Sequence, residues 1–235
     1  MEKERNKFFK GKLIGLGVIL LYLIATSFPY EFIGMFGINY NNLSILLKTI
    51  YLLTYEITLT LIIIYIYKKD IIPNFKDFIK NNIKYFKKYI KYWFLMLGLM
   101  IFSNLIVTFF TTTDIANNQD AIINTLKEAP IYTFIMTVFL APILEELVFR
   151  LSFRKMFPKW DILFIIVSGL VFGSMHVIGT VTHLIDLLFI IPYSIPGFIF
   201  AYVYTKSKNI FIPISLHFIH NGIMMSLQIL LFLIS

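Results

Sequence analysis

The chain has 235 residues, of which 58% are hydrophobic and 14% charged, and its mean hydropathy is +0.80. These values exclude an ordinary soluble domain and indicate a membrane protein. The net charge of +8 comes mainly from lysines in a few connections, so it predicts contact with an anionic lipid bilayer surface and not with nucleic acid. The absence of cysteine excludes disulfides and thiolate chemistry.

Several apolar windows are long enough to cross a hydrocarbon core of about 30 Å as helices. The predicted fold is therefore all-α, a polytopic bundle of about seven transmembrane helices. We expect the first window to be a retained helix, because no convincing small-x-small cleavage site follows it. In chain order the windows are residues 13–30, 43–67, 92–110, 131–157, 161–179, 184–204 and 210–234.

Lysine and arginine in the connections predict the orientation, since basic residues are held on the cytoplasmic side during insertion. Four segments are basic: the amino-terminal MEKERNKFFKGK, the connection 68–91, RKMFPKW and TKSKN. The alternating connections are not basic. This pattern predicts a cytoplasmic amino terminus and an external carboxyl terminus. The abundance of Lys, Asn, Ile and Phe suggests an AT-rich bacterium, and hence the bacterial cytoplasmic membrane.

The chain divides into two parts, and only the second contains candidate functional motifs. Residues 1–129 hold three predicted spans, the Lys-rich connection and a polar outer loop over 112–129 that is long enough for a short helix. Apolar side chains recur near helical spacing in the connection, which predicts an amphipathic helix on the inner leaflet; a solvated linker is the alternative. Residues 130–235 hold four spans and all the motifs described below, and we expect them to form the functional core.

Ionisable groups inside spans are costly and mark candidate functional sites. Counted from the predicted cytoplasmic boundary at 1.5 Å per residue, the groups of the last four spans lie at roughly 12–22 Å, so they are expected to meet near the midplane. The candidates chosen on this ground are Glu56, Glu145, Glu146, Arg150, His176, His217, His220 and Asn221.

Helical spacing separates the two glutamates of "EELVFR". Glu146 and Arg150 are four residues apart and predict an internal ion pair. Glu145 is turned about 100° away from Glu146, so it is expected to be the free carboxylate.

The same spacing places other polar groups on common faces. His217 and Asn221 are four residues apart, as are Phe172 and His176, so the Phe172 ring is expected to wall the imidazole. The G-x-x-x-G sequence over 169–173 predicts a close approach by a neighbouring helix. A carboxylate helped by a histidine can take a proton from water, and a second histidine with an amide N–H can stabilise an oxyanion. The set suits hydrolysis of an amide bond.

Three motifs resemble the CAAX protease and bacteriocin-processing family of intramembrane endopeptidases, also known as the Abi family. Its E-E-x-x-x-R appears as "EELVFR", its F-x-x-x-H as "FGSMH" and its H-x-x-x-N as "HFIHN". The resemblance covers about residues 131–225. It implies a glutamic protease in which Glu145 and His176 activate water and His217 and Asn221 form the oxyanion hole. Glu146 and Arg150 are expected to shape or support that site.

The resemblance implies no cofactor. The family was long described as metal-dependent, and a carboxylate with two histidines is able to hold zinc. We disfavour zinc because the chain has no H-E-x-x-H helix and Asn221 is a poor zinc ligand.

The predicted function is an intramembrane endopeptidase that cuts a membrane-associated or hydrophobic peptide, of the bacteriocin, immunity or peptide-signal processing type. A proton-coupled transporter is one alternative, although no inverted repeat is visible. A non-catalytic scaffold on the same fold is the other alternative, but no motif residue is lost.

Three polar residues lie outside the motifs. His183 and His220 match none of them, so we expect these histidines to have packing or interfacial roles. We expect Glu56 to form a hydrogen bond between helices. The alternative is that it modulates the site from a position near the cavity.

Overall fold

The computed structural model describes residues 2–111 and 116–234. The chain is 91% helical and has no strand within those ranges, which confirms the all-α prediction. The helices are α1 (Glu2–Ser27), α2 (Pro29–Gly34), α3 (Ile45–Ile66), α4 (Lys68–Thr111), α5 (Asn117–Glu128), α6 (Pro130–Ile135), α7 (Ala141–Glu146), α8 (Phe153–Met156), α9 (Asp161–Val177), α10 (Ile190–Ser207) and α11 (Phe211–Ile234). Shorter elements are η1 (Tyr40–Asn42), η2 (Met136–Leu140), η3 (Leu147–Ser152), η4 (Ile178–Thr180) and η5 (Leu184–Phe189).

Seven helical stretches among the described residues are long and apolar enough to cross a membrane, as predicted. The protein is therefore a multi-pass membrane protein. The stretches are Phe8–Ser27, Ile45–Ile66, Lys68–Thr111, Pro130–Met156, Asp161–Thr180, Leu184–Ser207 and Phe211–Ile234. Which end of the bundle faces the cytoplasm stays a prediction.

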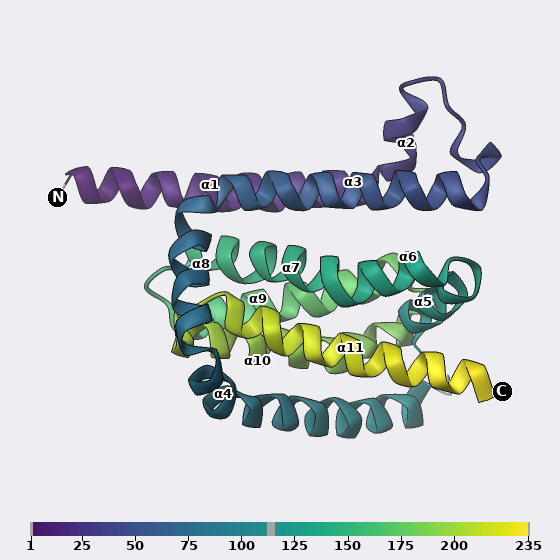
Figure 1. Ribbon diagram of the computed structural model, residues 1–235. Helices are drawn as coiled ribbons and strands as arrows, with labels where there is room; N and C mark the ends of the chain where they lie inside the picture. The colour runs from purple at the N-terminus through teal and green to yellow at the C-terminus, as the bar shows by residue number, and fades with distance from the viewer. Residues whose placement is uncertain (1, 112–115, 235) are drawn as a thin grey trace.

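The carboxyl-terminal helices form the interior of the molecule. The composite helix α6–α8 runs beside α9, α10 and α11, with α1 and α3 on one side and the second part of α4 on the other (Figure 1). Contacts agree with this layering, since α1 packs on α8 and η3, and α4 packs on α10 and α11. Polar groups of the four central helices are thus shielded by the helices of the amino-terminal part.

The third span differs from its prediction. Helix α4 is continuous over 44 residues, whereas we expected an amphipathic helix followed by a separate span from residue 92. Its first part crosses one end of the bundle, and its second part runs along the bundle (Figure 1). The first part is tied to two turns at that end: Asp70 pairs with Lys155 at 2.9 Å, and Asn209 Nδ2 donates to Asn74 O at 2.8 Å. The helix expected over 68–91 is present, and its depth in the membrane stays a prediction.

The fourth span, predicted over 131–157, is confirmed over Pro130–Met156, but it is not one regular α-helix. The segments η2 and η3 are π-helical and flank α7. Each π-helical turn holds an additional residue, and such turns are frequent at functional sites. In η3 the Ser152 hydroxyl donates to Leu147 O, five residues earlier, at 3.1 Å, and lies 2.7 Å from the Tyr67 hydroxyl.

Helices α9 and α10 approach each other closely because glycines face the contact. A Cβ atom added at Gly173 would lie 2.6 Å from Ser194 N and 2.8 Å from its Cα. One added at Gly197 would lie 2.7 Å from the Cα of Gly169. No side chain larger than hydrogen fits at either position without moving backbone. The close approach predicted from the G-x-x-x-G sequence is confirmed.

Candidate active site

The charges of "EELVFR" lie inside the bundle. The side chains of Glu146 and Arg150 are fully buried, and that of Glu145 is 15% exposed. Arg150 Nε lies 2.9 Å from Glu146 Oε2, and its Nη2 donates to Glu146 Oε1 at 3.2 Å. The predicted ion pair is therefore present, with one hydrogen bond and a second close N···O contact.

Arg150 is held from two further directions. Its Nη1 donates to Ser168 Oγ at 3.0 Å, and that hydroxyl donates to Phe149 O at 2.6 Å. The guanidinium carbon also lies 4.8 Å from the centre of the Phe172 ring, within cation–π range. Ser168 escaped the sequence-based prediction. It lies four residues before Phe172 and eight before His176, so helical spacing on α9 was the signal that could have found it.

Glu146 also contacts His217, which helical spacing along the fourth span did not predict. The two atoms, His217 Nδ1 and Glu146 Oε1, are 3.1 Å apart, and both side chains are buried. A carboxylate paired with arginine is an acceptor, so Nδ1 carries the proton. This contact orients the other ring nitrogen, Nε2, toward Glu145, whose Oε2 lies 3.9 Å away.

His176 approaches Glu145 from α9. Its Nδ1 donates to Phe172 O at 2.8 Å, because a carbonyl oxygen only accepts. Its Nε2 lies 4.0 Å from Glu145 Oε2. The imidazole lies against the Phe172 ring, as predicted, with the ring centres 4.5 Å apart, and it stacks on Tyr193 at 5.3 Å. Tyr193 belongs to none of the motifs and was not predicted.

Glu145 is the carboxylate left without a direct partner. Its Oε2 is buried and has no hydrogen-bond partner within the described part of the chain. The gaps of 3.9 and 4.0 Å to the two imidazoles are too long for direct hydrogen bonds and suit a bridging water or substrate oxygen. Glu146 and Arg150 balance each other, so Glu145 adds an excess negative charge.

Asn221 lies one helical turn beyond His217 on α11. Its Nδ2 donates to Thr137 O in η2 at 2.8 Å. The carboxamide has two N–H donors, and this contact uses one of them. Helix α11 is thus bound to the fourth span at two levels, through His217 to Glu146 and through Asn221 to η2.

Glu56 and the two remaining histidines lie outside this cluster. The hydrogen bond predicted for Glu56 is absent: its Oε2 is buried, and no polar group of the described chain reaches it. Glu56 does interact electrostatically with Glu145, because α3 packs beside α7. His220 is buried beside the Trp93 ring, as expected of a packing residue, and His183 precedes η5, where its backbone N–H donates to Asp186.

Glu145 and the Nε2 atoms of His176 and His217 are three possible metal ligands, the number of protein ligands in catalytic zinc sites. In the part of the chain that the structure describes, no group of three such side chains is arranged to hold a metal ion. Metal independence stays a prediction, which chelation tests.

The fold and these contacts define a polytopic helical membrane protein with a buried cluster of carboxylates and imidazoles. Residues 127–223 match the family model described as "Type II CAAX prenyl endopeptidase Rce1-like". The matched region contains all three motifs and coincides with the predicted span of the resemblance. This part of the chain is similar to the CAAX protease family, the same family that the motifs resemble.

Three relatives are similar to the chain: two carry peptidase or protease names, and the third matches a longer part of the chain. The "Putative membrane peptidase YdiL" of Bacillus subtilis is 28% identical over 48% of this chain and 44% of its own length. An uncharacterized protein of Mycoplasma capricolum is 30% identical over 85% of this chain and 61% of its own. The "Membrane-embedded CAAX protease MroQ" of Staphylococcus aureus is 30% identical over 61% and 60%. The matches thus span less than two thirds of these curated relatives, and no solved structure matches the chain.

Proposed function

We propose that the protein is an intramembrane endopeptidase of the bacterial cytoplasmic membrane that hydrolyses a peptide bond in a membrane-associated or hydrophobic peptide. One observation carries the proposal: a buried carboxylate oxygen of Glu145 faces two imidazole Nε2 atoms from other helices, at 3.9 and 4.0 Å. The family match and the names of two relatives, a membrane peptidase and a membrane-embedded CAAX protease, support the same class.

Glu145 acts as the general base. A water in the gap between Glu145 and the imidazoles gives one proton to Glu145 Oε2 as its oxygen attacks the scissile carbonyl carbon. The Nδ1 of His176 is committed to Phe172 O, so its Nε2 offers a lone pair that accepts the other hydrogen of the water and orients it. Removal of bulk water from this site strengthens both interactions.

His217 and Asn221 stabilise the oxyanion that forms. With Nδ1 donating to Glu146, His217 donates to the oxyanion through Nε2 when the ring carries its second proton. The second N–H of Asn221 is the other donor. The proton taken by Glu145 then passes to the leaving amide nitrogen, the C–N bond breaks, and the products are a carboxylic acid and an amine.

The position of the cluster supports a hydrophobic peptide as substrate. The side chains of His176 and Glu145 are 24% and 15% exposed, so the site is reached from the protein surface although it lies among helices. A peptide that partitions into the bilayer reaches such a site more readily than a soluble one. We therefore propose hydrophobic peptides of the bacteriocin, immunity or signalling type as substrates.

The test is cleavage of membrane-associated peptides by the purified protein in lipid bilayers, with products identified by mass spectrometry. We expect wild-type cleavage, loss of cleavage in Glu145→Ala and His217→Ala, and cleavage that survives strong chelation. Cleavage unaffected by both substitutions would refute the mechanism, and loss on chelation that zinc restores would establish a metalloenzyme. Proton-coupled uptake without cleavage would favour the transporter, and neither activity would favour the scaffold.

A further inference from the structure

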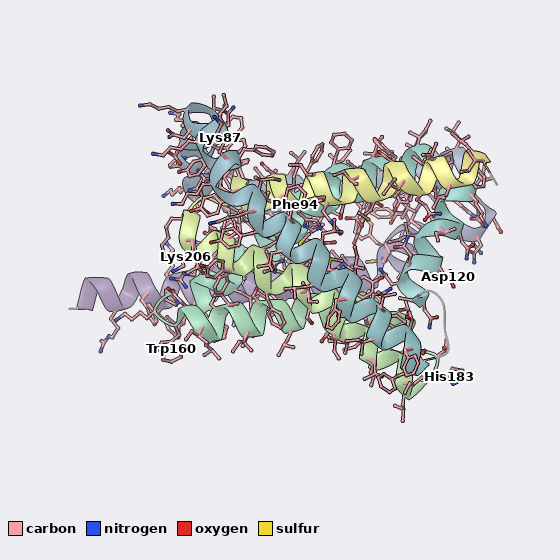
Figure 2. The ribbon with its side chains drawn as sticks, turned by 90° about the horizontal axis from the view of Figure 1, so that it is seen from below. Lys87, Phe94, Asp120, Trp160, His183 and Lys206 are labelled. Atoms are coloured by element: carbon pink, nitrogen blue, oxygen red, sulfur yellow. The ribbon has the colours of Figure 1, made fainter. Side chains whose placement is uncertain are left out.

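Helix α4 changes direction where its crossing part meets its membrane-spanning part, and lysines gather there. Residues at this bend line an open cavity of about 650 Å³. We define the basic elbow as the polar residues of that lining: Lys80, Asn81, Asn82, Lys84, Lys87 and Lys88. Figure 2 shows Lys87 at the bend, at the same end of the molecule as Trp160 and Lys206 and opposite Asp120 and His183.

The four lysines of the basic elbow form no close ion pair, although Lys80 interacts electrostatically with Asp77. None of them forms a salt bridge with a described residue. The nearest acids are engaged elsewhere, since Asp77 accepts hydrogen bonds from Tyr85 at 2.6 Å and from Asn209 at 2.8 Å, and Asp70 pairs with Lys155. Four like charges around one cavity repel each other unless an anion lies between them.

The segment of α4 just before the elbow is bonded to the rest of the bundle. Asn209 Nδ2 donates to Asn74 O and Asp77 Oδ2, both at 2.8 Å, and Ile210 N donates to Asn74 Oδ1 at 2.8 Å. These bonds join the crossing part of α4 to the turn between α10 and α11. The segment of α4 that leads into the elbow is therefore attached to the bundle end.

Apolar side chains near the elbow point to the source of the anion. Ile79, Ile83 and Phe86 are 57%, 68% and 50% exposed. On a helix that crosses the end of the spans, such side chains enter the acyl-chain boundary while lysines reach the headgroup level. The basic turns of this end, which carry Lys155 and Lys206, predict that it meets the anionic cytoplasmic leaflet.

We propose that the basic elbow binds the headgroup phosphate of an anionic phospholipid. Lysine ammonium groups bind phosphate as point charges, and the Asn82 carboxamide, whose oxygen alone is engaged by Ile83 N, adds a neutral donor. The proposal commits to a lipid of the surrounding leaflet, because the exposed apolar residues place the cavity beside the acyl chains. It does not depend on the proposed hydrolysis, since none of its residues belongs to the candidate active site.

The test is native mass spectrometry of the full-length protein from bilayers of phosphatidylcholine with phosphatidylglycerol, counting retained lipids of each kind. The elbow variant combines Lys80→Gln, Lys84→Gln, Lys87→Gln and Lys88→Gln. The control combines Lys10→Gln, Lys12→Gln, Lys206→Gln and Lys208→Gln, which removes equal charge at the same end of the bundle. We expect the elbow variant to lose the preference for phosphatidylglycerol by about tenfold or more and the control to keep it.

Equal preference in the elbow variant and wild type would overturn the proposal. If the elbow variant does not fold, wild type alone decides: its preference for phosphatidylglycerol should fall as salt rises, and a preference insensitive to salt contradicts an electrostatic site. Displacement of the retained lipid by inorganic phosphate at equal concentration would assign the site to a soluble anion and would also overturn the proposal. Peptide cleavage is not a readout, so failure here is distinct from failure of the proposed function.

Discussion

The ion pair between Glu146 and Arg150 allows the stability of the site to be measured apart from its activity. Both side chains are fully buried, and the contacts are 2.9 and 3.2 Å. Removing one member of a buried pair leaves an uncompensated charge, at a cost of about 3–5 kcal/mol. We therefore expect Arg150→Met to lower the free energy of unfolding by about that amount, with a further loss because Ser168 gives up a partner.

A double variant shows whether the loss comes from the isolated charge. Glu146→Gln with Arg150→Met removes both charges, and it should be clearly more stable than Arg150→Met alone. Unfolding free energies are measured by denaturant titration in detergent micelles. The control is Arg154→Met, because its partner Asp161 is 53% exposed and the loss should be far smaller. The reasoning is refuted if Arg150→Met resembles Arg154→Met, or if the double variant is no more stable than the single one.

Two further predictions concern packing and the second histidine. Gly173→Ala should destabilise the protein by about 1–3 kcal/mol, since its Cβ would lie 2.6 Å from Ser194 N; thermal unfolding should show no such loss for Gly98→Ala, which meets nothing within 4 Å. His176→Ala should lower the peptide cleavage rate by about 10²-fold or more, measured with product peptides by mass spectrometry. His183→Ala, a histidine outside the cluster, should keep the rate, and equal losses in both would contradict the assignment.

Much of the site could be predicted because its geometry is local. Glu146 and Arg150 lie four residues apart in one span, so helical spacing alone is enough to predict that they pair. The spans themselves follow from hydropathy, since a lipid-exposed backbone must satisfy its hydrogen bonds within a helix. The close contact at Gly173 follows from the absence of a side chain there.

The rest depends on how helices pack, which spacing along one helix does not contain. The contact between His217 and Glu146 joins residues 71 positions apart. Glu56 has a polar side chain inside a span, which favoured a hydrogen bond, yet no partner from α7 or η2 reaches its Oε2. The π-helical turns in the fourth span could not be predicted from hydropathy either. Hydropathy depends on which residues are present and not on how many residues each helical turn contains.

The most direct measurement of the central claim is the cleavage rate of Glu145→Gln. The substitution keeps the size of the side chain and one of its acceptor oxygens but removes the base. We expect the rate to fall by about 10²–10⁴-fold while helix content and thermal stability stay at or above wild type. Glu128→Gln, on the exposed face of α5, is the control and should cleave at the wild-type rate. A Glu145→Gln variant that cleaves as fast as this control would contradict the account.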